Sequence, residues 1–168
     1  MDSGLLVVRV VFGLVMAAHG AQKVFGWFGG YGLAGTGGFF EQLGFKPGKT
    51  FAALAGATEI ASGLLVATGL LGPIGPALML SVMVVAIATV HWANGLFAQN
   101  NGIEVPLLYS TAAVAIALTG YGAYSLDAAL GLTSFWTEGF TLAVLALGAI
   151  GGAANLALRR PSPAAAAA

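Results

Sequence analysis

Residues 51–71 read FAALAGATEIASGLLVATGLL, and this stretch decides the fold class. It is apolar over the ~20 residues that a helix needs to cross the hydrocarbon core of a membrane. Glu59 is its only ionisable side chain. The stretch therefore predicts a membrane-spanning helix. Because a carboxyl group is costly to keep inside a bilayer, Glu59 is also a candidate functional residue.

Four further apolar runs of similar length flank this stretch: Leu5–Val24, Ile74–Val90, Val105–Tyr121 and Phe140–Leu158. Hydrophobic residues make up 58% of the 168 residues and charged residues only 7%. A soluble domain of this composition would aggregate in water. The sequence thus predicts an all-α fold, a polytopic transmembrane helical bundle in contact with the lipid bilayer.

The composition excludes several classes of function. The chain has no cysteine, which excludes thiol exchange, iron–sulfur clusters and zinc–thiolate sites. Its formal net charge is zero and its Lys and Arg residues are scattered, so no basic stripe for nucleic acid is present. Asp2 and Arg9 are atypical of a signal peptide, so we expect the first run to be a retained span.

Five crossings would divide the loops between two membrane faces. Face A would hold the N-terminus, the turn at Gly72–Pro73 and the segment Gly122–Gly139. Face B would hold the loops Lys23–Thr50 and His91–Glu104 and the C-terminus. Face B collects five basic residues, Lys23, Lys46, Lys49, Arg159 and Arg160, whereas face A has only Arg9. The positive-inside rule then predicts a cytoplasmic C-terminus and an N-terminus outside.

Local patterns predict several smaller features. Phe25–Gly38 alternates aromatic residues with glycines, which indicates either a tight loop folded onto the bundle or a flexible connector. Phe39–Phe45 has the pattern of a short interfacial helix, and Ser125 is placed to cap a short helical turn. Gly148 and Gly152 allow close helix packing, either within the bundle or in a homo-oligomer. We expect the tail 161–168 to be disordered.

The polar residues within the predicted spans form the candidate site. A rise of about 1.5 Å per residue places six of them in the half of the bundle toward face B: His19, Gln22, Lys23, Glu59, His91 and Glu104. Small residues share the helix face of Glu59, so its carboxyl should point into the bundle and contact His19 or Lys23. Arg9 stands apart, and it could reach face A or extend toward Glu59 as an ion pair.

This cluster has a structural and a functional interpretation. A buried ion pair can serve packing specificity alone, or the cluster can handle protons or bind a ligand. His19 and His91 lie at similar depths, which permits a bis-histidine haem, but His91 ends a helix and haem is therefore disfavoured. No local spacing motif indicates a metal site, and none is predicted.

An ordered series of short motifs runs from about Leu5 to Leu130. The motifs are Arg9, His19-Gly20-x-Gln22-Lys23-x-Phe25-Gly26, Gly37-Gly38-Phe39-Phe40, Leu54-Ala-Gly56-x-x-Glu59, His91-x-x-Asn94-Gly95-Leu-Phe97, Glu104-x-Pro106-Leu107-Leu108 and Tyr124-Ser125-Leu126-Asp127-Ala128. Together they resemble the DoxX family of bacterial integral membrane proteins.

The resemblance implies a four-helix core over residues 1–130, with a Gly- and aromatic-rich loop at 25–50. Residues 131–160 would then add a fifth, C-terminal span. The family takes its name from a relation to a quinone-linked thiosulfate oxidoreductase, and many members carry oxidoreductase labels. The resemblance implies a place in a bacterial plasma membrane, but it assigns no catalytic residue.

Three functions are consistent with these observations. The first, favoured by the resemblance, is a redox-associated subunit that binds quinone and acts with oxidoreductase partner proteins, since the chain has no cofactor fingerprint of its own. The second is a non-enzymatic protein that binds or transports a hydrophobic molecule or scaffolds a complex. The third is a proton- or ion-coupled channel. The sequence does not show whether the chain is itself an enzyme.

Overall fold

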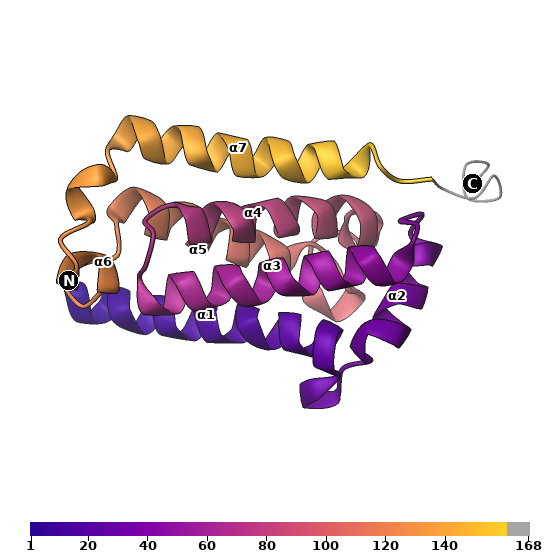
Figure 1. Ribbon diagram of the computed structural model, residues 1–168. Helices are drawn as coiled ribbons and strands as arrows, with labels where there is room; N and C mark the ends of the chain where they lie inside the picture. Colours follow the sequence, from indigo (N-terminus) through magenta and orange to yellow (C-terminus); the bar gives the residue numbers. More distant parts are fainter. Residues whose placement is uncertain (161–168) are drawn as a thin grey trace.

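A computed structural model describes residues 1–160 of the chain, and every regular element in this range is a helix. The predicted all-α fold is confirmed, and the expected disorder of 161–168 lies outside the described residues. The helices are α1 (Asp2–Phe25), α2 (Gly32–Gln42), α3 (Gly48–Thr68), α4 (Ile74–Ala86), α5 (Glu104–Thr119), α6 (Leu126–Ala129) and α7 (Glu138–Leu156), with short 3₁₀ turns at Trp27–Gly29, Trp92–Asn94, Ala98–Asn100 and Thr133–Phe135 (Figure 1).

Four helical segments are long and apolar enough to cross a membrane. They are α1, α3, α7 and the continuous segment Ile74–Asn94, in which α4 runs on through a π-helical turn. The predicted third span, Ile74–Val90, is therefore longer than expected. α5 has only 16 residues, a length of about 24 Å, and is shorter than each of these four segments.

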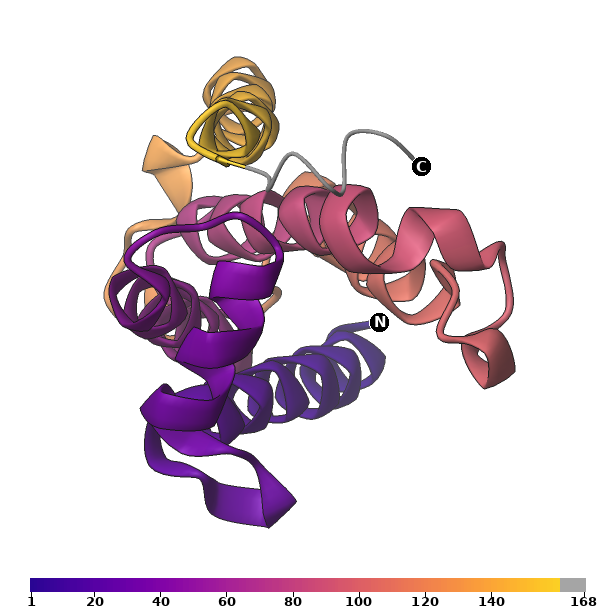
Figure 2. The same cartoon turned by 90° about the vertical axis from the view of Figure 1, so that its right-hand side faces the viewer.

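The helices form a bundle with α1 and α7 on opposite sides. α3 lies beside α1, α4 and α5 occupy the middle, and α7 packs against α4 as an outer layer (Figures 1 and 2). The N-terminus and the end of α7 lie at opposite ends of the bundle. This arrangement agrees with an odd number of crossings, whereas the side of the membrane on which each end lies stays a prediction.

Pairs of glycines bring α1 and α3 into backbone contact. A Cβ atom added at Gly13 would lie 2.5 Å from the carbonyl oxygen of Gly63, closer than any real Cβ contact. A Cβ at Gly20 would overlap the carbonyl oxygen of Gly56 in the same way. The glycines of α3 belong to the small-residue face noted in the sequence, and those of α1 are their partners. This contact sets the separation of the two helices.

The small residues of α7 pack against α4 within the same chain. Gly148 lies on the carbonyl oxygen of Ala77, and a Cβ at Gly152 would lie 2.5 Å from that of Ser81. The end of α7 is tied to the turn between α2 and α3, because Arg159 Nε donates to the Leu43 carbonyl at 2.9 Å. Of the two uses left open for this pattern, the structure shows packing within the bundle.

The glycine-rich segment after α1 is more regular than expected. The predicted interfacial helix Phe39–Phe45 begins earlier and ends sooner, as α2 over Gly32–Gln42. Gly37 lies against the backbone of Gly48 at the start of α3, where a side chain on either residue would clash. Close packing on α3 thus stabilises a helix that glycine content alone argues against.

We expect Gly20→Ala to destabilise the protein by about 1–3 kcal/mol, because its methyl group would be forced into the backbone of α3. Gly4→Ala is the matched control, since no atom lies within 4 Å of a Cβ at that position of the same helix. Thermal unfolding in one detergent compares the two variants. Equal midpoints for both would show that the glycine contact does not limit the approach of the helices.

Candidate functional site

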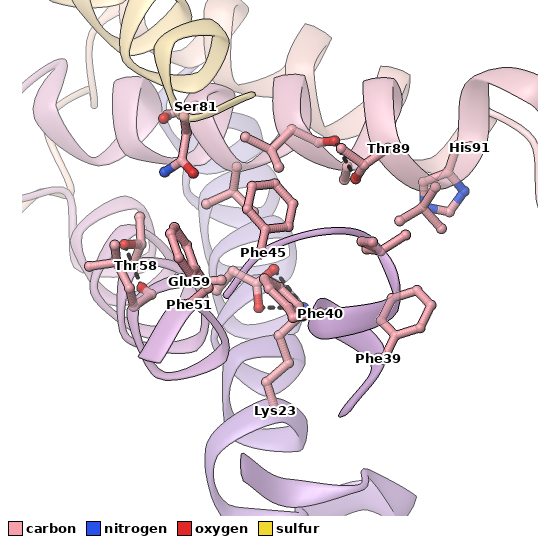
Figure 3. A pocket seen from close by; sticks show the side chains of 18 of the residues that line it. Lys23, Phe39, Phe40, Phe45, Phe51, Thr58, Glu59, Ser81, Thr89 and His91 are labelled. Atoms are coloured by element: carbon pink, nitrogen blue, oxygen red, sulfur yellow. Dashed lines mark hydrogen bonds and ion pairs between the residues drawn. The ribbon is translucent and has the colours of Figure 1, made fainter. Parts of the chain in front are cut away.

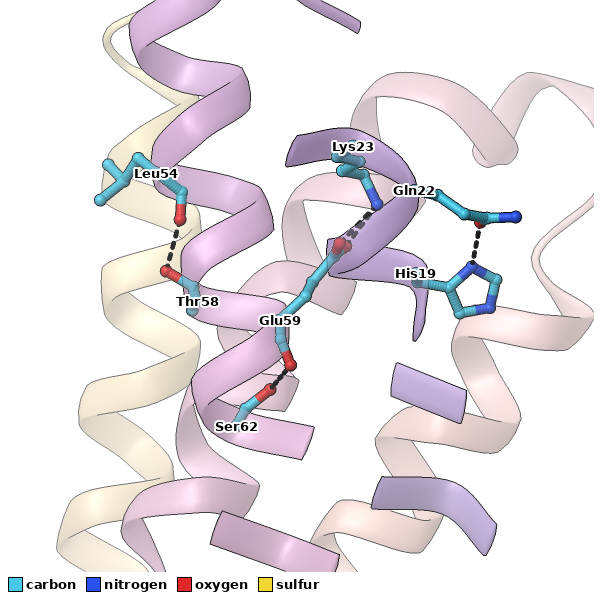
Figure 4. A network of polar contacts seen from close by, with 7 residues as sticks. All are labelled: His19, Gln22, Lys23, Leu54, Thr58, Glu59 and Ser62. Atoms are coloured by element: carbon cyan, nitrogen blue, oxygen red, sulfur yellow. Dashed lines mark hydrogen bonds and ion pairs between the residues drawn. The ribbon is translucent and has the colours of Figure 1, made fainter. Parts of the chain in front are cut away.

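A buried ion pair joins the end of α1 to the middle of α3. Lys23 Nζ lies 2.6 Å from both carboxylate oxygens of Glu59 (Figure 4). The Glu59 side chain is 4% exposed and that of Lys23 is 28% exposed. The predicted contact of Glu59 with Lys23 is therefore present in the structure, and the close approach of Gly20 and Gly56 one turn away permits it.

This ion pair borders a cavity of about 350 Å³ between α2, α3 and α4 (Figure 3). Four aromatic side chains, Phe39, Phe40, Phe45 and Phe51, line it together with aliphatic residues of α3 and α4. The hydroxyl groups of Thr58 and Thr89 are bonded to carbonyl oxygens of their own helices, so they present little polarity to the cavity. The walls are mostly apolar, and the charged lining groups are Lys23 and Glu59.

His91 lies at the face-B end of the same cavity, in the π-helical turn Ile87–His91 (Figure 3). Its Nδ1 lies 2.8 Å from the carbonyl oxygen of Asn101. Because a carbonyl only accepts, Nδ1 is the donor, and Nε2 of the neutral ring is left as an acceptor. The Asn94 amide also donates to the Asn101 carbonyl, at 3.3 Å, and so helps to hold it in place.

The π-helical turn was not predicted from the sequence. Such turns are rare in proteins as a whole, and those that occur are often found at functional sites, because the wider turn changes the direction of the side chains that follow it. Here Thr89, Val90 and His91 of this turn all line the cavity. The sequence carries no reliable signal for a π turn, since its residues form an ordinary apolar helix end.

His19 and Gln22 lie nearby but have another role. His19 Nδ1 donates to Gln22 Oε1 at 3.3 Å, and Gln22 Nε2 donates to the Phe28 carbonyl at 3.1 Å. The imidazole also packs edge-on against Tyr109. These contacts hold the turn after α1. His19 is not among the residues that line the cavity, so the two histidines do not share a site there.

A second hollow of about 640 Å³ lies between the end of α1 and α2. Gln22 lines this hollow, and Lys23, Phe39 and Phe40 line both spaces. These three side chains therefore form the partition between the apolar cavity and the more open hollow near face B. Lys23 is the partially exposed member of the ion pair.

Glu104 lies outside the cavity as well. Its Oε2 accepts a hydrogen bond from the Ala98 amide at 2.7 Å, and this contact holds the loop before α5. Of the six residues predicted to converge, the structure brings Lys23, Glu59 and His91 to one cavity, and it places the other three in contacts beside it. That this cavity is a functional site stays a prediction.

Arg9 is fully buried at the opposite end of the bundle, toward face A. Its guanidinium donates to the Tyr124 carbonyl at 2.5 Å and lies over the Tyr121 ring, 5.4 Å from the centroid. The salt bridge found within residues 1–160 joins Lys23 to Glu59, so the alternative ion pair between Arg9 and Glu59 is not formed. Arg9 reaches face A instead, because the loop before α6 supplies its acceptor.

The loop around Arg9 closes face A. The Asp127 carboxylate accepts the amide hydrogens of Leu71 and Gly72 at 2.8 and 2.6 Å. Ser125 Oγ accepts from the Ala128 amide at 3.2 Å, which is the predicted cap of a short helix. Asp127 and Glu59 do not belong to a metal-binding set, since residues 1–160 contain no group of three or more His, Cys, Asp or Glu side chains that could hold a metal ion.

The helices, the buried ion pair and the apolar cavity define a multi-pass helical membrane protein with an internal cavity near one face. A family model for DoxX matches residues 4–92, more than half of the 168 residues. The chain therefore belongs to the DoxX family. The matched region includes Arg9, Lys23, Glu59 and His91. No curated protein and no solved structure matches the chain.

We expect Lys23→Met to be more destabilising than Glu59→Gln. The first change leaves the carboxylate of Glu59 buried without a partner, at a cost of about 3 kcal/mol. The second leaves Lys23, which is partially exposed and can turn toward water, so about 1 kcal/mol is expected. Unfolding free energies in detergent test this order.

The double variant Lys23→Met/Glu59→Gln is the control, because it removes both charges together. It should be more stable than Lys23→Met alone, since no unpaired charge stays buried. Equal losses of unfolding free energy in the two single variants would contradict the view that Glu59, the more deeply buried of the two, depends more strongly on its partner.

Proposed function

We propose that the protein binds a quinone-type molecule in the cavity between α2, α3 and α4, and that it acts as a membrane subunit of quinone-linked redox chemistry. The observation that carries the proposal is the combination of a mostly apolar cavity with a few polar groups, among them Lys23, Glu59 and His91. A quinone needs an apolar slot for its ring and chain and hydrogen-bonding groups for its oxygens.

The size and shape of the cavity support this proposal. Its volume of about 350 Å³ falls in the range of about 300–1,000 Å³ that is typical of small-molecule sites. Its lining follows α4 from Leu78 to His91, a rise of about 20 Å along the helix. An apolar space that extends along a helix suits a molecule that carries a hydrocarbon chain, and polar groups near face B suit its ring.

Electron transfer would depend on other components. The chain has no cysteine and no cofactor fingerprint, so electrons would pass to or from the quinone through oxidoreductase partner proteins or a bound cofactor. Lys46 and Lys49 are exposed beside the turn that precedes α3, at the face of the bundle where the cavity lies. We propose that this face is the cytoplasmic side of a bacterial plasma membrane.

A second candidate is a non-enzymatic protein that binds or carries a hydrophobic molecule. It is favoured by the apolar walls of the cavity, which would accept many hydrocarbon chains without any redox chemistry. The two candidates differ in the bound molecule: the first requires a ring with redox-active oxygens, whereas the second requires only apolar surface.

Native mass spectrometry of the protein in mild detergent tests both. We expect an added mass that matches a quinone, and we expect Ala55→Phe to abolish it, because Ala55 lines the cavity and the larger ring would fill it. Leu64→Phe is the matched control: it lies on the same helix, is 48% exposed and does not line the cavity.

The outcomes separate the candidates. Quinone lost in Ala55→Phe and kept in Leu64→Phe supports the redox proposal. A different apolar molecule with the same dependence supports the carrier. A protein without a bound molecule, or a quinone retained in Ala55→Phe, overturns the assignment of this cavity.

A further inference from the structure

We infer that the cavity binds the reduced quinol, which bears hydroxyl groups, in preference to the oxidised quinone. This inference rests on the proposed function and specifies which form of the molecule the site selects. It follows from the hydrogen-bonding capacity of the polar groups around the cavity, because a quinol can both donate and accept, whereas the carbonyl oxygens of a quinone only accept.

His91 makes the distinction. Its Nδ1 donates to the Asn101 carbonyl at 2.8 Å, so the hydrogen of the neutral ring resides on Nδ1. Nε2 is then an acceptor, and within residues 1–160 it makes no hydrogen bond. A ligand that contacts this atom must supply a donor. A hydroxyl group of a quinol does so, and a quinone carbonyl would set two acceptors against each other.

The polar side chains nearest to His91 in the sequence and on the facing helix do not meet this need, and Ser81, which also lines the cavity, lies ten residues before His91, about 15 Å along the helix. Thr89, two residues before His91, donates its hydroxyl hydrogen to the Val85 carbonyl at 2.8 Å. The Thr58 hydroxyl on the facing helix donates to the Leu54 carbonyl at 2.8 Å. Each hydroxyl has only one hydrogen, so neither can also serve His91. The Asn94 amide points to Val90 and Asn101, at 2.9 and 3.3 Å.

The groups of the ion pair already bond each other. Lys23 has three hydrogens and directs two of them to the two oxygens of Glu59, both at 2.6 Å. The remaining hydrogen of the ammonium group can serve a carbonyl or a hydroxyl oxygen of the ligand, so Lys23 supports the binding of both forms. Because both oxygens of Glu59 already accept from Lys23, the acceptor without a partner that distinguishes the two forms is Nε2 of His91.

Two hydrogen bonds to one carbonyl oxygen fix the orientation of the His91 ring. The Asn101 carbonyl belongs to the loop that precedes α5, and Asn94 donates to that same oxygen. A histidine whose second nitrogen is bonded in this way keeps one tautomer and one ring orientation. A site built to accept a hydrogen from its ligand rejects an analogue that lacks it, because the acceptor is left unpaired.

The test measures the affinity of the full-length protein in lipid nanodiscs for a decyl-substituted benzoquinone and for the quinol obtained from it by chemical reduction. Titrations are made without oxygen. We expect the quinol to bind about fivefold more tightly, the order of one neutral hydrogen bond. His91→Phe should bring this ratio to about one and leave the quinone affinity within about twofold.

His19→Phe is the matched control, because it changes the other histidine, which bonds Gln22 and does not line the cavity. Its affinity ratio should equal that of the unchanged protein. Tighter binding of the quinone than of the quinol, or an affinity ratio that His91→Phe leaves unchanged, overturns the inference while the proposed function stands. If neither form binds, the proposed function fails and the inference fails with it.

Discussion

The contact between α1 and α3 is the constraint on which the other features of the structure depend. Gly13 lies against Gly63 and Gly20 against Gly56, so the two backbones touch at points seven residues apart on each helix. In a bilayer, close packing of this kind replaces the hydrophobic effect as the force that holds helices together. It also sets the distance across which Lys23 reaches Glu59.

The charged side chains of the bundle interior have different kinds of partner. Glu59 and Lys23 form a short ion pair, which compensates for removing the carboxylate from water. Within residues 1–160 Arg9 has no carboxylate partner; its Nη2 donates to a backbone carbonyl and the guanidinium faces an aromatic ring near face A, while Nε and Nη1 are buried without a hydrogen bond to these residues. The first pair borders a cavity, whereas Arg9 joins α1 to the loop that closes the other end. The two ends of the bundle are thus chemically distinct.

Several elements follow from local sequence, and others do not. The spans were predictable because apolar length is a local property. Depth and helix phase predicted a contact of Glu59 with His19 or Lys23, and the structure shows the one with Lys23. α2 was placed too late in the chain, because residues 32–38 include four glycines, and the packing of Gly37 against the start of α3 is not visible in the local sequence. The π turn at His91 and the packing of Gly148 and Gly152 against α4 depend on contacts between segments distant in sequence.

The sequence by itself determined that the chain is a helical membrane protein and which few polar residues interrupt or border its apolar segments, because the free energy of transfer into lipid depends on residue type and segment length. Only the tertiary structure decided which of those residues share a cavity. It separated His91 from His19, placed Arg9 away from Glu59 and bonded His91 to a carbonyl ten residues along the chain. Such pairings depend on the separation and rotation of packed helices, which no single segment encodes.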